Sequence, residues 1–192
     1  MIKYIMIALL ITVVFVAILA FKPNNIEMPT YRVIKNYGDV EIREYPAMVV
    51  AQTNLTQSSQ EQRMNNGFRT IAGYIFGGNE RNQKIAMTAP VVMKMGDTAS
   101  MYFMMPKKYS TSELPKPNSN KVEIVEERAR VLAVIRYGGF SSEKKIEKYK
   151  NKLADIISKN HLNTTGPYMY MGYNAPWDVI NRRNEVAIEV VE

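Results

Sequence analysis

The sequence predicts an α+β fold in which two pseudo-symmetric β-α-β-β halves pack together and two helices cover one curved antiparallel sheet. An internal repeat is the first observation that predicts it, because the pattern of residues 40–51 (V-E-I-x-E, then A-x-V-x-A) returns at residues 122–133. The second observation is a serine-initiated helical pattern after each copy, at Ser58 and at Ser141. A repeat this long predicts two supersecondary units, because a solenoid needs several shorter repeats. The cleft where two such halves meet is a common place for a ligand.

Residues 1–22 are predicted to be a separate N-terminal element. Tyr4 to Phe21 is an uncharged run of eighteen residues that lies between Lys3 and Lys22, and this length is at the lower edge for a membrane-spanning helix. The residues just before Ala20 are large, so the small-residue pattern of a cleavage site is poorly formed. We therefore predict an uncleaved transmembrane signal-anchor, with secretion after cleavage as the alternative. The flanking charges barely specify the orientation, but a lone N-terminal anchor usually implies export of the domain to a periplasmic or other extracytoplasmic space.

A short linker at residues 23–30 precedes the first half of the domain, which spans about residues 31–106. Its strands are predicted from apolar alternation between turn residues, and Pro46 belongs at a bulge or an edge. The strand patterns are Tyr31–Lys35, Val40–Ala51 around Pro46, Lys84–Met95 and Ser100–Met105.

The helix of the first half is predicted from its cap, its period and its end. Ser58 caps the helix, with Glu61 three residues on, at the spacing of a capping box. Gly77-Gly78 ends it. Its apolar face is formed by Met64, Phe68, Ile71, Ala72 and Ile75.

The second half, about residues 121–192, repeats this plan after a loop. Prolines, serines and asparagines crowd residues 107–120, and this composition favours a loop. A second helix is predicted from Ser142 to about Asn160, with lysines along its outward face. Its inward residues are Ile146, Tyr149, Leu153, Ile156 and Ile157, and the strand patterns around it are Lys121–Tyr137, Tyr168–Tyr173 and Glu185–Val191.

Charge and composition narrow the classes of function. The formal net charge of +7 suits an anionic ligand or a membrane surface, although a lysine-rich solvated face is the simpler explanation. The chain has no cysteine, which excludes disulfides and thiolate metal sites, and its single histidine, His161, excludes a multi-histidine metal site. Nucleic acid is not a predicted partner, because basic and aromatic residues do not interleave. Gly77-Gly78 is not followed by the lysine and serine of a nucleotide-binding loop.

Four motifs resemble the SOUL/haem-binding protein family. They are Lys84–Val91 (K-I-A-M-T-A-P-V), Tyr74–Asn79 (Y-I-F-G-G-N), Gly172–Pro176 (G-Y-N-A-P) and Arg182–Val186 (R-R-N-E-V). They occur in the family's order, and the resemblance covers the chain from about Tyr31 onward. It implies a distorted β-barrel built from two βαββ halves, similar to the effector-binding domains of some transcription regulators.

The resemblance also implies non-covalent binding of haem or another tetrapyrrole, for carriage or buffering, in a shallow hydrophobic groove beside the first helix. Arg63 and Arg69 are candidates to pair with the haem propionates, because guanidinium groups suit carboxylates. Trp177 would cover the groove as a lid or seal the end of the barrel. Gly73 departs from the family, in which some relatives have a basic residue here. The implied groove residues are Met64, Phe68, Ile71, Ala72 and Ile75, approached by Tyr173.

Axial ligation of a haem iron is left open by the sequence. His161 lies at the predicted end of the second helix, away from the groove, where a histidine is more often a dipole partner than a ligand. Tyr173 is a second potential ligand, as tyrosine is in some haem proteins. Binding by burial and ring stacking without a strong ligand is what the family implies. The methionines, which mostly alternate along strands, are predicted to fill the core.

Two alternative functions are also considered. The first is a small-molecule or protein interaction module on the same fold, with incidental haem binding and a partner held by the Lys107–Asn120 loop. The second and weaker one is a hydrolase that uses a buried Glu185 as general acid or base. A strand-start glutamate paired with Arg182 or Arg183 is the simpler interpretation of Glu185.

Overall fold

The computed structural model describes residues 26–56, 59–96, 98–175, 177–178 and 180–191. The predicted membrane anchor at residues 1–22 and the start of the predicted linker lie outside these ranges. Within the described ranges, no helix has both the length and the apolar character that crossing a bilayer requires.

The order of elements follows the predicted plan of strands on either side of two helices. Each half contains two strands before its helix and two after it, and one further strand precedes the first half. The elements are β1 (Arg32–Tyr37), β2 (Val40–Tyr45), β3 (Met48–Asn54), α2 (Gln60–Ile75), β4 (Val91–Lys94), β5 (Ser100–Met104), β6 (Glu123–Glu127), β7 (Arg130–Gly138), α3 (Glu143–Lys159), β8 (Asn163–Gly172) and β9 (Arg183–Val191).

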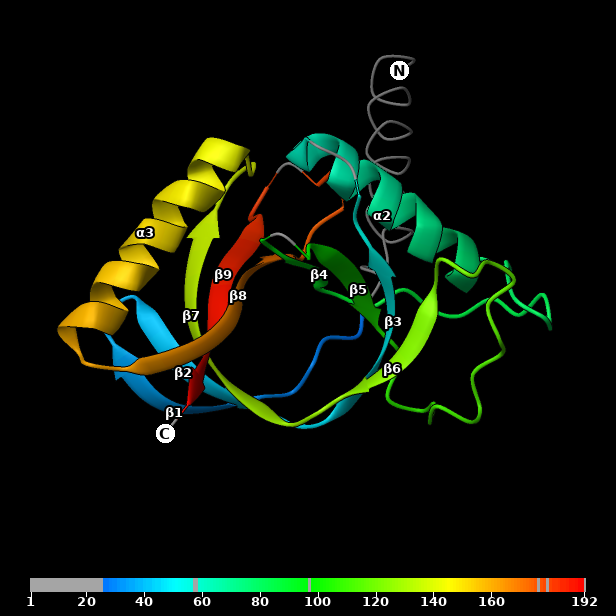
Figure 1. The fold of residues 1–192 in the computed structure, drawn as a ribbon, viewed down its shortest axis with the longest axis horizontal. Coiled ribbons are helices and arrows are strands. Elements are labelled where there is room, and N and C mark those ends of the chain that lie inside the picture. Colours follow the sequence, from blue (N-terminus) through cyan, green and yellow to red (C-terminus); the bar gives the residue numbers. More distant parts are fainter. Residues whose placement is uncertain (1–25, 57–58, 97, 176, 179, 192) are drawn as a thin grey trace, which may run out of the picture.

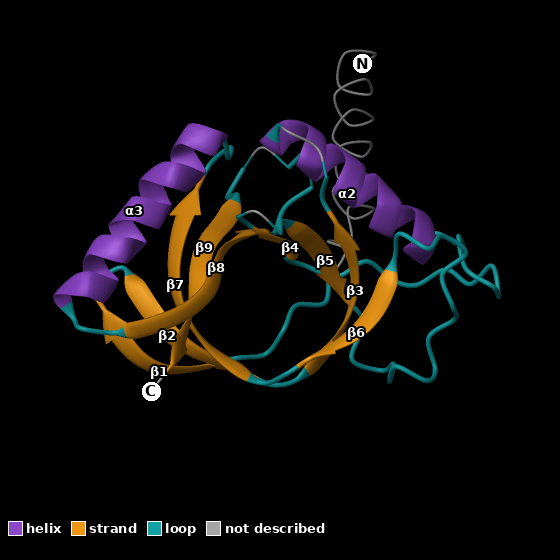
Figure 2. Ribbon diagram, in the orientation of Figure 1, coloured by secondary structure: helices purple, strands orange, loops and turns teal. Residues whose placement is uncertain are grey.

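The nine strands form one antiparallel sheet in the order β1-β2-β7-β9-β8-β4-β5-β3-β6. The two sides of the sheet meet where β4 pairs with β8, from Val91 opposite Gly172 to Lys94 opposite Met169. The sheet curls into a half-barrel, and both helices lie on its outer face (Figures 1 and 2). Helix α2 packs on β3 and β5, whereas α3 packs on β7, β8 and β9. The fold is therefore an α+β half-barrel with its concave face turned away from the helices.

Two apolar layers stabilise the sheet, one on each face. Successive side chains of a strand point to opposite faces, so on β7 Ala133 and Ile135 join the layer beneath the helices. Leu132 and Val134 join the layer inside the half-barrel. The layer under the helices contains Ile71, Ile75, Leu153 and Ile157 together with Phe103 and Val186. The inner layer contains Tyr45, Tyr102, Met171, Tyr173 and Ala187, and Ile26 and Tyr31 pack against it.

Helix α2 begins one residue later than predicted. Ser59 is the N-cap, and its hydroxyl accepts a hydrogen bond from the Gln62 backbone N–H at 3.3 Å. The predicted cap at Ser58 was therefore wrong, and Ser58 itself lies outside the described residues. Both serines have the chemistry of a cap, and the sequence alone does not distinguish two adjacent candidates.

The predicted strand over Lys84–Met95 is shorter in the structure, where only Val91–Lys94 pairs as a strand. The preceding segment bonds elsewhere. The Ile85 N–H donates to the Ile75 carbonyl at 2.8 Å, and the Thr88 hydroxyl donates to the Met104 carbonyl at 2.7 Å. These bonds hold the segment between the end of α2 and β5. Strand β8, by contrast, is longer than predicted and begins at Asn163, with a register shift between Thr165 and Met169.

Both helices end in the same backbone motif. After α2, the Gly78 N–H donates to the Gly73 carbonyl at 2.8 Å and the Gly77 N–H donates to the Tyr74 carbonyl at 3.3 Å, which is the Schellman pattern. Gly77 has a φ of 115°, a region that glycine adopts without steric cost. After α3 the corresponding position is His161, with a φ of 51°. The single histidine thus has a structural position at a helix end.

We expect two glycine substitutions at this helix end to change stability in opposite directions. Gly73→Ala adds a methyl group that meets nothing within 4 Å. It should raise the free energy of unfolding by about 0.5–1 kcal/mol, because alanine loses less backbone entropy in a helix. Gly78→Ala would place its Cβ 2.6 Å from the Gly73 carbonyl oxygen. It should lower the free energy of unfolding by about 1–3 kcal/mol. Urea unfolding followed by circular dichroism measures both changes. The same change in unfolding free energy in the two variants would contradict the Schellman motif at the end of α2.

Candidate functional site

The predicted groove face of α2 divides into a buried part and a part that reaches the surface. Ile71 and Ile75 are fully buried and Ala72 is nearly so, because α2 packs them onto the sheet. Met64 and Phe68 are half-buried at the edge of the same layer, and the Phe68 ring lies 5.3 Å from that of Phe103. A ligand beside α2 would therefore contact Met64 and Phe68, while the other three residues support the helix from below.

The two predicted arginines lie in different surroundings. Arg63 is half-buried, and its Nε is buried without a hydrogen-bond partner in the described part of the chain. Arg69 is exposed and lines a cavity between α2 and β3. A buried N–H without a partner is costly, so Arg63 is the arginine that an anionic group would satisfy. Of the two predicted arginines, Arg63 is thus the one with a buried donor that no described residue satisfies.

Tyr173 and Trp177 are close in sequence but differ in burial. Tyr173 is buried in the inner layer, and its hydroxyl donates to the Glu185 carboxylate at 2.8 Å. Burial raises the pKa of Tyr173 well above its ordinary value, and the negative charge of Glu185 adds to this effect. Trp177 lies in the loop between β8 and β9 with 80% of its surface exposed, so it does not seal the barrel. Arg182 donates to the Ala175 and Asp178 carbonyls and so braces this loop.

Glu185 is the centre of a buried ionic network. Its carboxylate accepts from Arg43 at 2.9 Å and from Arg183 at 2.8 Å, in addition to the Tyr173 hydroxyl, and its side chain is 0% exposed. Burial works against the charge on Arg43, but the hydrogen bond and charge of Glu185 outweigh it and raise the pKa of Arg43. Burial also raises the pKa of neighbouring Tyr45 to about 12. A carboxylate enclosed by three donors is suited to holding strands together and not to moving protons for a substrate.

Aromatic rings complete this network. The Arg43 guanidinium lies 4.4 Å from the Tyr31 ring centroid, and that of Arg183 lies 3.9 Å from the Tyr173 ring. Pairing of Glu185 with Arg183 was predicted, but the partnership with Arg43 was missed. Arg43 lies 142 residues away along the chain, and no local pattern joins the two positions.

His161 is exposed and lies after the C-terminal end of α3, not beside α2. Its backbone N–H donates to the Ser158 carbonyl at 3.2 Å. Across the described ranges, no group of three or more histidine, aspartate or glutamate side chains is placed to hold a metal ion. Arg63, Met64 and Phe68 therefore lie together on α2. Arg69 belongs to the same helix but lines the cavity beside β3, whereas Tyr173 and His161 lie outside α2.

Two solved structures have a fold similar to that of this chain. The crystal structure of the EcmrR C-terminal domain matches with a TM-score of 0.63 and 10% sequence identity, and the match covers 84% of this chain and 98% of that one. A crystal structure of a hydrolase from Listeria innocua matches with a TM-score of 0.58 and 6% identity, and the match covers 82% of this chain and 94% of that one. At these identities the matches show a shared fold alone.

Sequence similarity shows the protein family to which this chain belongs. The family model described as SOUL heme-binding protein matches residues 26–189, and the chain belongs to this family. Heme-binding protein 2 of Homo sapiens is 30% identical over 161 residues, which cover 78% of this chain and 77% of the human protein. Heme-binding protein 2 of Mus musculus is 27% identical over 175 residues, which cover 84% of each chain. The resemblance seen in the four motifs is thereby confirmed.

The Glu185 network should contribute strongly to stability. Glu185→Gln keeps the shape of the side chain but removes the counter-charge shared by buried Arg43 and half-buried Arg183, and it leaves Arg43 with Glu41 as its acidic partner. It should lower the free energy of unfolding by about 3–5 kcal/mol. Glu44→Gln is the matched control, because Glu44 pairs with Arg32 at the exposed edge of the sheet, and it should cost less than about 1 kcal/mol. A Glu185→Gln protein as stable as the control, in urea unfolding, would show that the network does not stabilise the fold.

Proposed function

We propose that this protein binds haem or a related tetrapyrrole non-covalently, in a groove beside α2, and carries or buffers it near a membrane. The observation that carries this proposal is the match to the SOUL heme-binding protein family over residues 26–189. Heme-binding protein 1 of Xenopus laevis, 24% identical over 154 residues, adds a third relative with a haem-binding name. We infer a binding role and not a catalytic one from these relatives.

The surface of α2 supports this location. Met64 and Phe68 offer a thioether and a ring at the edge of the core, where they would contact a face of the porphyrin. The unpartnered Nε of Arg63 would donate to a propionate, a charge-assisted bond that is stronger than a neutral one. Trp177 is exposed on the β8–β9 loop, where its ring is available to stack on a planar ligand.

Ligation by a strong axial group is not part of the proposal. The chain has no cysteine, and His161 belongs to the end of α3. The Tyr173 hydroxyl is engaged by Glu185, and its raised pKa disfavours the phenolate that iron would prefer. Burial of the ring and its stacking on apolar and aromatic side chains would supply the affinity.

The location proposed for the domain rests on the N-terminal sequence. The uncharged run from Tyr4 to Phe21 would anchor the protein in a membrane, with the domain exported. Few residues separate Lys22 from Ile26, which packs against the inner layer. An extended residue spans at most about 3.6 Å, so the domain would stay close to the bilayer into which free haem partitions.

We also propose that the two halves arose by duplication, and the strand order supports this. The sheet is symmetric about its central β4–β8 pair. The strand order is β2-β7-β9-β8 on one side of this pair and β6-β3-β5-β4 on the other, each read from the edge toward the centre. Each helix follows the second strand of its half. The repeated sequence patterns also fall on matching strands, on β2 and β3 in one half and on β6 and β7 in the other.

Haemin titration should separate the α2 groove from the rest of the surface. Phe68→Ser and Arg63→Gln should each weaken haemin binding about tenfold, a loss of about 1.4 kcal/mol, because they remove ring contact and a propionate partner. Ile156→Ser is the matched control, since Ile156 is a half-buried residue of α3. The full chain in lipid nanodiscs is titrated and followed by Soret absorbance and by quenching of its only tryptophan, Trp177. Empty nanodiscs provide the reference.

A second variant tests axial ligation. His161→Gly keeps the left-handed helix end that alanine would strain, and it should leave the Soret spectrum unchanged. Loss of the Soret shift in this variant would move the site to α3. Equal weakening by Phe68→Ser and Ile156→Ser, or no saturable shift in the unmodified chain, would overturn the α2 groove.

A further inference from the structure

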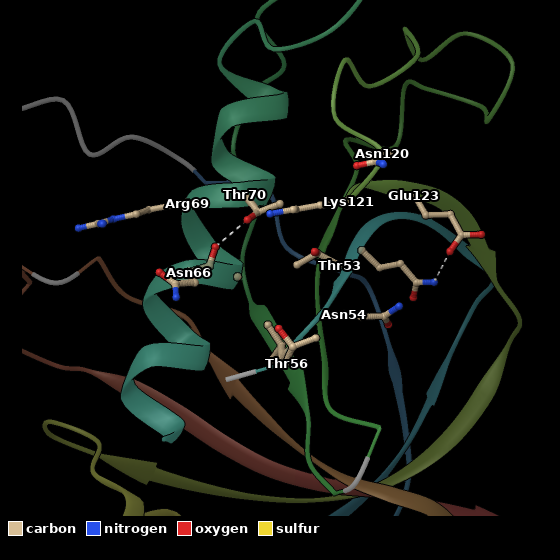
Figure 3. Close-up of a pocket in the computed structure, with 12 residues that line it drawn as sticks. Thr53, Asn54, Thr56, Asn66, Arg69, Thr70, Asn120, Lys121 and Glu123 are labelled. Carbon is tan, nitrogen blue, oxygen red and sulfur yellow. Dashed lines mark hydrogen bonds between the residues drawn. The ribbon is translucent and has the colours of Figure 1, made fainter. Parts of the chain in front are cut away.

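A polar cavity of about 530 Å³ lies on the side of α2 that faces β3 and the start of β6 (Figure 3). It is not part of the haem groove proposed above. Its lining contains no aromatic residue, and Leu55 and Gly67 are the apolar members among residues that are otherwise polar or charged. A planar tetrapyrrole has nothing to stack on here. The cavity is therefore suited to a different class of ligand.

The base of the cavity contains a threonine whose residue is almost fully covered. Thr53 is 5% exposed and follows Ala51 on the face of β3 that packs beneath α2. Its hydroxyl makes no hydrogen bond with any described residue. Its oxygen is not fully covered and opens to the cavity, where a ligand or water can bond to it.

The walls of the cavity add side-chain amides. Asn54, Asn66 and Asn120 are exposed and line the cavity, and no described residue hydrogen-bonds to their amide groups. Other asparagines of this fold are engaged. For example, the Asn79 amide donates to the Tyr74 and Gln83 carbonyls, and that of Asn184 donates to Gly139. Each amide offers both a donor and an acceptor, which is the pairing that vicinal hydroxyls need.

The charge in the cavity is positive. Lys121 crosses the gap toward Thr70 of α2, as Figure 3 shows, and no described acidic group pairs with its ammonium. The Glu123 carboxylate at the far wall accepts a hydrogen bond from Gln52 at 3.1 Å. Arg69 extends away from the gap and adds positive charge at the rim (Figure 3). The lining thus combines an exposed lysine that has no acidic partner among the described residues with hydroxyls and amides around it.

We propose that this cavity binds a small hydroxylated anion, of the chemical class of a hexose phosphate or a sugar acid. Lys121 would pair with the anionic group, since an ammonium binds phosphate or carboxylate as a point charge. Thr53 and the three asparagines would bond to the hydroxyls of the ligand. This site does not depend on haem binding, because it shares none of Arg63, Met64 or Phe68.

Glucose 6-phosphate is the first probe, and glucose and inorganic phosphate are titrated separately for comparison. Calorimetric titration of the full chain should show saturable binding of glucose 6-phosphate that is tighter than binding of either component. Lys121→Gln should weaken it about tenfold by removing the cation. Lys144→Gln removes an exposed lysine of α3 and should leave the affinity unchanged. Equal losses in the two variants would reduce the binding to general electrostatics and overturn the site.

Thr53→Val separates ligand binding from folding. Valine has the same shape and suits a strand, so the unfolding midpoint should equal or exceed that of the unmodified protein. The affinity for the probe should nevertheless fall several-fold. Unchanged affinity in Thr53→Val would remove the Thr53 hydroxyl from the site. Absence of saturable binding of both glucose 6-phosphate and glucuronate would overturn the proposal, whatever the result of the haemin titration.

Discussion

The buried carboxylate of Glu185 is the interaction on which the half-barrel depends. It joins β9 to β2 through Arg43, although β7 lies between these strands, and it also fixes Tyr173 at the end of β8. Taking these charges out of water is costly, and only a nearly complete set of hydrogen bonds offsets the cost. Arg183 supplies the second counter-charge. Buried ionic contacts thus stabilise the curled sheet together with its apolar inner layer.

This arrangement leaves little space around Tyr173 on the concave side of the fold. The segment from Ile26 to Tyr31 packs against the inner layer, with the Tyr31 ring 5.1 Å from that of Tyr45. The space left between Pro29 and Tyr173 is about 20 Å³, the size of a water and far below that of a cofactor. A larger cavity of about 370 Å³ lies where Glu27 to Thr30 meet β3 and β5, and Met48 and Met104 of the inner layer line it. Helix α2, by contrast, has an apolar edge and a polar edge. The two proposed sites use these two edges.

The order of elements could be predicted because it depends on local patterns: alternation in strands, serine caps and glycine ends. The depth at which each residue is buried could not be predicted from the sequence. Met64 and Ile71 share one helical face, yet only Met64 reaches the surface, because the period of a helix gives direction and not distance from the core. The contact between Arg43 and Glu185 and the cavity around Thr53 each join distant segments. Their residues carry no shared sequence signal.

Methionine methyl NMR tests the central claim, that haem binds at the apolar edge of α2 and not in the concave face. The chain has 13 methionines, and their methyl groups sample both locations. Met64 lies at the edge of α2, whereas Met104 and Met171 belong to the inner layer. Iron in added haemin broadens the signals of nearby methyl groups. The account predicts broadening of Met64 with sharp signals from Met104 and Met171. The reverse pattern would contradict it and place the ligand inside the half-barrel.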